Sequence, residues 1–156
     1  MRTSTSDYSR IFYDHLAQTT EHPMGLEVDS ADGIYIYDKA GNSYIDMISG
    51  ISVNNVGHSH PHVIKTIQDQ LKKHMHVMAY GEFIQDAQSQ LAEKLTEILP
   101  GNLNCFYLVN SGTEANEGAI KLAKRYTGRS EIISCYRSYH GNTSGSLSIT
   151  GNEQKK

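Results

Sequence analysis

The sequence contains only two cysteines, Cys105 and Cys135, and no apolar run near the roughly 18 residues that a transmembrane helix needs. Two thiols cannot build a disulfide framework, and because both stand in apolar runs we expect them to be buried. Residues 1–20 are polar and lack the apolar centre of a signal peptide. We therefore expect a cytoplasmic protein without a membrane partner.

Positive charge is not in excess either. Lys and Arg number 14 against 17 Asp and Glu, which gives a formal net charge of −3. Nucleic acids are bound through clustered Lys and Arg, so a nucleic-acid partner is not expected. Charged residues make up 20% and hydrophobic residues 38% of the 156 residues, which excludes a highly charged disordered chain and permits a packed domain.

Several common motifs are missing. The sequence has no G-x-x-x-x-G-K-[ST], G-x-G-x-x-G or G-x-S-x-G, which disfavours nucleoside triphosphates, dinucleotides and serine hydrolase chemistry. The chain has 8 histidines, but no carboxylate or cysteine stands near them at metal-ligand spacing. Turns and helix caps account for these histidines more simply, so metal binding stays a minor alternative and no metal ligand is assigned.

The residue pattern predicts an α/β fold. In the first part of the chain we expect a helix over 8–16, a β-hairpin with strands at 33–38 and 43–46, a loop over 47–61, and helices over 61–74 and 84–99. In the last third, apolar runs at 105–109 and 131–135 flank a helix that Gly128 ends. We interpret this as a β-α-β unit with two parallel, neighbouring strands.

The junction between the first of these runs and its helix is the strongest local signal. Ser111 and Glu114 have the spacing of a capping box. Gly112 lets a ligand approach the backbone, while Ser111 and Thr113 add hydroxyl groups. Because a helix N-terminus presents free N–H groups, the junction suits a phosphate. A plain helix cap without a ligand explains residues 110–114 (NSGTE) equally well.

A second polar segment, residues 138–141, follows the next apolar run. Its side chains should emerge at the same edge of the sheet as Ser111, Gly112 and Thr113. Tyr139 in this segment is able to stack on a flat ligand. The two segments together indicate a planar, phosphorylated cofactor.

These motifs resemble those of the class III pyridoxal-phosphate-dependent aminotransferases, which have fold type I. The resemblance is carried in order by residues 32–38 (DGIYIYD), 41–46 (GNSYID), 49–53 (SGISV), 57–61 (GHSHP), 110–117 (NSGTEANE), 139–141 (YHG) and 148–151 (SITG). It implies an α/β fold with an incomplete large domain, mostly parallel sheet with flanking helices, over 53–156. Residues 1–52, a helix and a hairpin, would belong to the small domain.

The resemblance also implies residue roles. Ser111, Gly112 and Thr113 would hold the phosphate of pyridoxal phosphate, Tyr139 would stack on its ring, and His140 would be a neighbouring pocket residue. The substrates would be an amine or amino acid and a keto acid. Val53, next to Ser52, and Tyr80 correspond to residues that line the substrate entrance at a dimer interface, so a homodimer is implied for the intact enzyme.

Two departures from the family pattern stand out. Family members are more than twice as long, and their lysine that forms the Schiff base with the cofactor lies downstream of the Tyr-His-Gly motif. None of the lysines here matches it, so no catalytic residue is assigned, and we expect this N-terminal fragment to be inactive alone and marginally stable. Asn142 stands where members acting on ornithine, acetylornithine or 4-aminobutyrate carry an arginine, which favours a branch using pyruvate or glyoxylate.

Two further interpretations stay open. One is another pyridoxal-phosphate reaction on the same fold, such as that of a decarboxylase, an aminomutase or a racemase. The other is a non-catalytic fragment that binds phosphate or dimerises.

Overall fold

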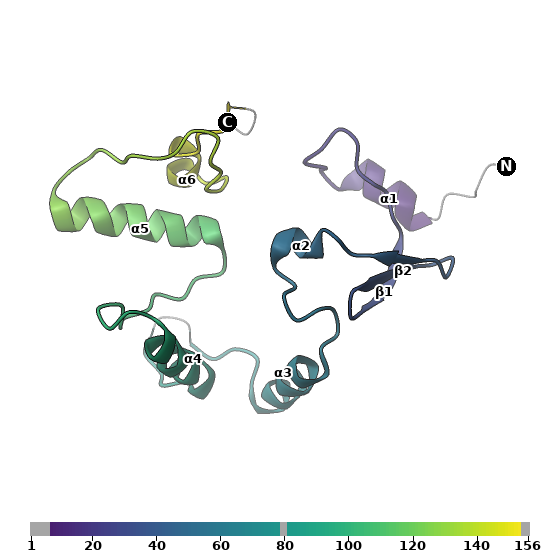
Figure 1. Ribbon diagram of the computed structural model, residues 1–156, viewed down its shortest axis with the longest axis horizontal. Helices are drawn as coiled ribbons and strands as arrows, with labels where there is room; N and C mark the ends of the chain where they lie inside the picture. The colour runs from purple at the N-terminus through teal and green to yellow at the C-terminus, as the bar shows by residue number, and fades with distance from the viewer. Residues whose placement is uncertain (1–6, 79–80, 154–156) are drawn as a thin grey trace. The chain divides into compact units, whose positions relative to one another are not determined.

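The structure is a computed structural model that describes residues 7–78 and 81–153 (Figure 1). The chain divides into two compact units, Met1–Ala79 and Tyr80–Lys156. The expected boundary between 52 and 53 concerns the domains of the complete enzyme, and it stays a prediction.

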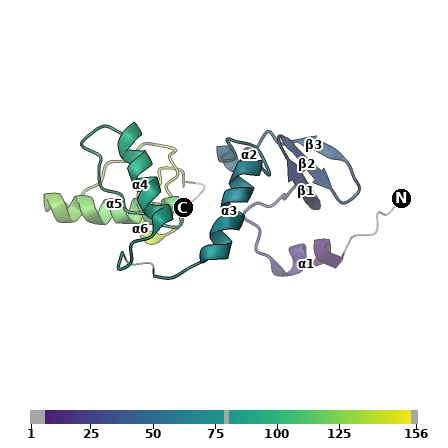
Figure 2. The same cartoon turned by 90° about the horizontal axis from the view of Figure 1, so that it is seen from below.

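The first unit contains a small antiparallel sheet. Its strands are β1 (Val28–Asp32), β2 (Tyr35–Asp38) and β3 (Ser43–Ile45), in the order β1-β2-β3 (Figure 2). Strands β2 and β3 form the expected hairpin, while β1 was not anticipated from the sequence. Helix α1 (Asp7–His15) precedes the sheet and confirms the helix expected over 8–16.

The hairpin turn is closed by one side chain. Asp38 accepts hydrogen bonds from the backbone N–H groups of Ala40 (2.9 Å) and Asn42 (2.8 Å). Gly41 has a φ of +85°, which glycine adopts without steric cost. Tyr44 then donates its hydroxyl proton to Asp38 at 2.9 Å, so the turn is tied to β3.

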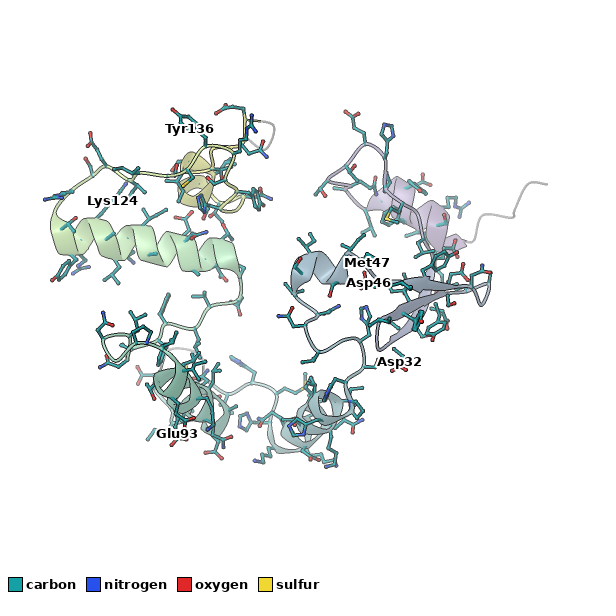
Figure 3. The ribbon with its side chains drawn as sticks, viewed as in Figure 1. Asp32, Asp46, Met47, Glu93, Lys124 and Tyr136 are labelled. Carbon is teal, nitrogen blue, oxygen red and sulfur yellow. The ribbon has the colours of Figure 1, made fainter. Side chains whose placement is uncertain are left out.

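A left-handed turn follows the sheet, where the sequence predicts a loop. Helix α2 (Ser49–Ser52) has positive φ at all four positions, from +52° to +64°. Asp46 holds its start, because its carboxylate accepts hydrogen bonds from the N–H groups of Ile48 (3.1 Å) and Ser49 (2.8 Å). His58 binds the other oxygen of Asp46 at 2.7 Å (Figure 3 labels Asp46).

Helix α3 (Pro61–Lys73) closes the first unit and matches its expected span. Pro61 lies at the first helical position, where its missing N–H costs no hydrogen bond. His74 forms the C-cap with an extended backbone. The apolar stripe of this helix is solvent-exposed, and Ile67 for example keeps 54% of its surface accessible.

The second unit is helical. It contains α4 (Asp86–Ile98), α5 (Gly112–Thr127) and α6 (Ser144–Ser148), and α5 packs against α6 (Figure 1). Gly128 ends α5 with a left-handed backbone (φ +69°), as expected from the sequence. Helix α4 begins two residues later than predicted and ends at Ile98.

The predicted parallel β-α-β unit is wrong for this chain by itself. Residues 105–109 and 131–135 form no strand, and no strand occurs within 81–153. A strand needs a neighbour that pairs with its N–H and C=O groups, and the two runs do not pair with each other. Ile133 is 99% exposed, so the apolar content of these runs is not covered within the described residues.

No hydrophobic side chain in the described part of the chain is buried. Among the described residues, the buried polar ones are Ser146 and Thr150, and the Ser146 hydroxyl bonds to the first turn of α5. Cys105 and Cys135 are exposed, so the prediction of buried thiols is wrong, for the same reason that their runs lack covering layers. Among the described residues no helix has the length and apolar character needed to cross a bilayer.

Candidate cofactor site

The first part of the site is the N-terminal turn of α5, which is closed by a variant of the capping box. Ser111 is the N-cap, and its Oγ accepts a hydrogen bond from the N–H of Glu114 at 3.3 Å. Glu114 reaches back, and its Oε2 accepts from the N–H of Asn110 (2.8 Å) and the hydroxyl of Ser111 (3.1 Å). The spacing of Ser111 and Glu114 predicted the cap by Ser111, whereas the return bond of Glu114 reaches the N–H of Asn110 in place of that of Ser111.

Backbone donors without an acceptor remain in this turn. The N–H groups of Gly112 and Thr113 have no intrahelical carbonyl to bind, and neither has a hydrogen-bond acceptor among the described residues. The space around Gly112 is open, because a Cβ placed there would meet no atom within 4 Å. The positive end of the α5 dipole lies at the same point, so the turn fits an anion such as a phosphate.

The second part of the site is the loop that contains Tyr139, His140 and Gly141. Gly141 is buried against Thr113, and a Cβ at Gly141 would overlap the Thr113 side chain. The side-chain amide of Asn116 donates to the carbonyl of His140 at 2.7 Å. The structure therefore brings the two polar segments singled out in the sequence together on one side of α5.

The ring of Tyr139 belongs to the accessible surface of this loop. The residue is 55% exposed, and its hydroxyl donates to the side-chain oxygen of Asn142 at 3.1 Å. The backbone next to it is fixed, because the N–H of His140 donates to Thr150 Oγ1 at 3.1 Å. The loop thus presents an aromatic ring from a backbone that is held at two points.

A carboxylate that sequence reasoning left without a role ties α5 to the segment that follows the Tyr139 loop. Glu117 accepts hydrogen bonds from the hydroxyl of Thr143 (2.5 Å) and from the N–H groups of Gly145 (2.8 Å) and Ser146 (3.1 Å). The Thr143 hydroxyl, more than any other group, lowers the pKa of Glu117 below its usual value. Glu117 is four residues after Thr113, so the helical period alone places both on one face of α5.

Two residues, Val53 and Tyr80, were expected at the substrate entrance. Val53 belongs to the first unit, directly after the left-handed turn, and is 67% exposed. Tyr80 lies outside the described residues. Their assignment stays a prediction.

Three histidines have structural positions in the first unit. His58 pairs with Asp46, and the side-chain amide of Asn54 lies 3.4 Å from its other ring nitrogen. His60 and His74 flank α3 as its caps. Within residues 7–78 and 81–153, no three His, Cys, Asp or Glu side chains are grouped so that they could hold a metal ion.

Comparison with known proteins decides the family. The sequence model of the protein family 'Aminotransferase class-III' matches residues 16–156 of the chain. The chain belongs to this family. Class III aminotransferases depend on pyridoxal phosphate, and the residues of the α5 turn and the Tyr139 loop fit its phosphate and ring as described above.

The similar proteins are much longer than this chain. An acetylornithine aminotransferase from Halalkalibacterium halodurans is 41% identical over 131 residues, which are 84% of this chain and 33% of that protein. An adenosylmethionine-8-amino-7-oxononanoate aminotransferase from Methanocaldococcus jannaschii has a TM-score of 0.85 and 31% identity, over 94% of this chain and 36% of that one. The chain thus spans about a third of the relatives that it matches.

A third relative carries the cofactor. The taurine:2-oxoglutarate aminotransferase from Bifidobacterium kashiwanohense, solved with pyridoxal phosphate and glutamate, has a TM-score of 0.82 and 32% identity, over 99% of this chain and 35% of that one. These similarities confirm the α/β fold class and its assignment to fold type I, of which this chain is a part.

Proposed function

We propose that this chain is the N-terminal part of an aminotransferase that moves an amino group from an amine or amino acid to a keto acid. Its own contribution is to bind and orient pyridoxal phosphate. The observation that carries the proposal is the packing of Gly141 on Thr113, because it joins a phosphate-binding turn to a loop with an exposed aromatic ring.

The residues divide the task between them. The N–H groups of Gly112 and Thr113 hold the phosphate at the positive end of α5, and Ser111, whose hydroxyl is bonded to Glu114, keeps this turn in place as the helix cap. Tyr139 covers one face of the ring, and His140 lines the pocket beside it. Pyridoxal phosphate, when bound, supplies an aldehyde group that takes up the amino group. Its pyridine ring draws electron density from the substrate carbon that carries this amino group.

Turnover needs a lysine to bind the cofactor covalently and to carry a proton. None of the lysines of this chain is assigned to that role, and the relatives extend over about three times its length. We therefore propose that the chain by itself binds the cofactor without turning over substrate, and that the complete enzyme supplies the lysine.

Two substrate classes are candidates for the complete enzyme. The first relative is named acetylornithine aminotransferase, which favours an amino donor with an acidic end. Asn142 argues against this, because its amide accepts a hydrogen bond from Tyr139 and cannot supply the cation that grips a carboxylate. A branch that uses pyruvate or glyoxylate as the acceptor is the second candidate.

The assembly and location of the complete enzyme rest on the family resemblance. We propose a cytoplasmic homodimer in which Val53 and Tyr80 line the substrate entrance. In the same way, residues 1–52 are assigned to the small domain and 53–156 to the large domain.

Cofactor binding by the 156-residue chain is tested by equilibrium dialysis with pyridoxal phosphate and with pyridoxal, which lacks the phosphate. Pyridoxal phosphate should bind at least about tenfold more tightly, since charge-assisted hydrogen bonds at the helix terminus contribute on the order of 1–2 kcal/mol. Tyr139→Ala should weaken binding, whereas Tyr136→Ala, at a residue that is 98% exposed, should not (Figure 3 labels Tyr136).

Either of two results would refute the proposal. One is equal affinity for pyridoxal phosphate and pyridoxal. The other is an equal effect of the Tyr139 and Tyr136 variants.

A further inference from the structure

Glu117 stands at the centre of a hydrogen-bond network that lies behind the phosphate-binding turn. A single oxygen, Oε1, accepts from the Thr143 hydroxyl and from the N–H groups of Gly145 and Ser146. All three donors come from the segment that follows the Tyr139 loop, 26 to 29 residues beyond Glu117 in the chain. The carboxylate therefore holds this segment against α5, and we call these three hydrogen bonds the Glu117 clamp.

The network also fixes the direction of two hydroxyl groups. A threonine hydroxyl has one proton, and Thr143 gives its proton to Glu117. Thr143 Oγ1 must therefore act as the acceptor in its 2.7 Å contact with Thr113 Oγ1. The proton of Thr113 consequently points to Thr143, away from the open side of the turn.

The same segment is anchored at its far end. Ser146 is fully buried, and its hydroxyl donates to the carbonyl of Thr113 at 3.0 Å. The hydroxyl of Thr150 donates to the carbonyl of Ser146 at 2.9 Å and accepts from the N–H of His140 at 3.1 Å. A continuous path of hydrogen bonds thus leads from Glu117 to the backbone beside Tyr139.

We propose that Glu117 is a positioning residue of the cofactor site, an inference that rests on the proposed function. Its carboxylate holds the segment 143–146 against α5, and through Ser146 and Thr150 it fixes the loop that presents Tyr139. It also directs the Thr113 hydroxyl to Thr143, so that the turn offers the phosphate its backbone N–H groups while the Thr113 side chain secures the loop.

Two substitutions separate the charge of Glu117 from its shape. Glu117→Gln keeps the length and one acceptor oxygen but removes the negative charge that strengthens the three hydrogen bonds. Glu117→Ala removes the acceptor altogether. The matched control is Glu93→Gln on α4, because the Glu93 side chain is exposed and lies outside the site (Figure 3 labels Glu93).

The experiment measures two properties of the full chain and of each variant. The first is amide hydrogen exchange at Gly145 and Ser146, with Leu122 in the middle of α5 as an internal reference. The second is the dissociation constant for pyridoxal phosphate by equilibrium dialysis. We expect Glu117→Gln to speed exchange at both amides and to weaken binding about tenfold, Glu117→Ala to do more, and Glu93→Gln to change neither.

The two readouts keep this inference apart from the proposed function. Faster exchange with unchanged cofactor affinity would overturn the positioning role, because the clamp would then be merely structural. Unchanged exchange at Gly145 and Ser146 in Glu117→Ala would overturn the clamp itself. If the unsubstituted chain does not distinguish pyridoxal phosphate from pyridoxal, the proposed function and the cofactor-positioning role both fail, and the exchange data still decide whether Glu117 is a clamp.

Discussion

The hydroxyl oxygen of Thr113, in the first turn of α5, lies 2.7 Å from the hydroxyl oxygen of Thr143 in the loop before α6. Thirty residues of chain separate the two side chains. Together with Gly141, which packs on the same threonine, this contact makes one surface from two segments that the sequence presents separately.

Gly141→Ala should disrupt the surface most directly. Gly141 has a φ of +126°, which L residues rarely adopt, and an added Cβ would overlap the Thr113 side chain. We expect affinity for pyridoxal phosphate to fall by at least about tenfold, as for the loss of a well-formed polar contact. Gly101→Ala is the control, because a Cβ there meets nothing within 4 Å; equal affinities for the two variants would contradict the packing described.

Ser111→Ala should destabilise α5 from its N-terminus. The substitution removes the acceptor for the Glu114 N–H and the hydroxyl that binds Glu114 Oε2. N-cap losses of this kind cost about 1 kcal/mol. Amide exchange in the first turns of α5 should therefore become faster, by about fivefold. Ser89→Ala in the interior of α4 should leave exchange in α5 unchanged, and a similar acceleration there would point to a general effect of losing a serine.

Asp46 should make the first unit sensitive to acid. Hydrogen bonds from the N–H of Ser49 and from His58 hold the pKa of Asp46 below its usual value. The folded chain then binds fewer protons than the unfolded chain, so stability is present above about pH 4 and is lost as the pH falls through the folded pKa. The protection of the Ile48 and Ser49 amides, taken as the intrinsic exchange rate at each pH divided by the observed rate, should therefore fall between pH 6 and pH 3.

The control for that measurement is Asp46→Asn, which should exchange faster at neutral pH and lose most of the pH dependence. If the unsubstituted chain and Asp46→Asn respond to acid in the same way, the carboxylate does not hold the left-handed turn.

The isolated chain should be marginally stable and prone to association. None of its described hydrophobic side chains is buried, and Ile133, Tyr107 and Tyr126 are more than four-fifths exposed. Large exposed apolar areas of this kind mark surfaces that another layer covers. We expect strong binding of a hydrophobic dye and a broad thermal transition. A sharp, cooperative transition of the monomer in calorimetry would show that the chain builds a core of its own.

No lysine of the isolated chain should be labelled specifically by the cofactor. After incubation with pyridoxal phosphate and reduction with borohydride, peptide mapping should find only low, scattered modification of surface lysines such as Lys124 (Figure 3). Transaminase turnover should be absent in the same preparation. Stoichiometric labelling of one lysine, or measurable turnover, would place the missing chemistry within these 156 residues.

Local signals in the sequence were sufficient for the elements that short-range physics controls. Ser111 and Glu114 predicted the capping box, Gly128 the end of α5, and Pro61 the start of α3, because each depends on residues within one helical turn. The hairpin of β2 and β3 was predicted for the same reason. The parallel strands at 105–109 and 131–135 were not obtained, since a strand depends on neighbours far away in the sequence.

The role of Glu117 shows what short-range reasoning does not reach. The helical period puts Glu117 on the same face of α5 as Thr113, but nothing in the sequence identifies Thr143, Gly145 and Ser146 as its donors. The left-handed turn at Ser49–Ser52 was missed as well, because Asp46 and His58 stabilise it from outside the segment.

For this protein, the amino-acid sequence by itself determined the family, the capped turn at Ser111 and the segment that contains Tyr139, because these are short motifs in a recognisable order. The sequence also placed the turn and the loop at one edge of a parallel sheet, but only the tertiary structure decided that they meet through contacts with α5, and that Glu117 binds the segment after the loop. The reason is physical: a motif is defined by neighbours along the chain, whereas a contact across 30 residues exists only after the backbone has folded to bring its two ends together.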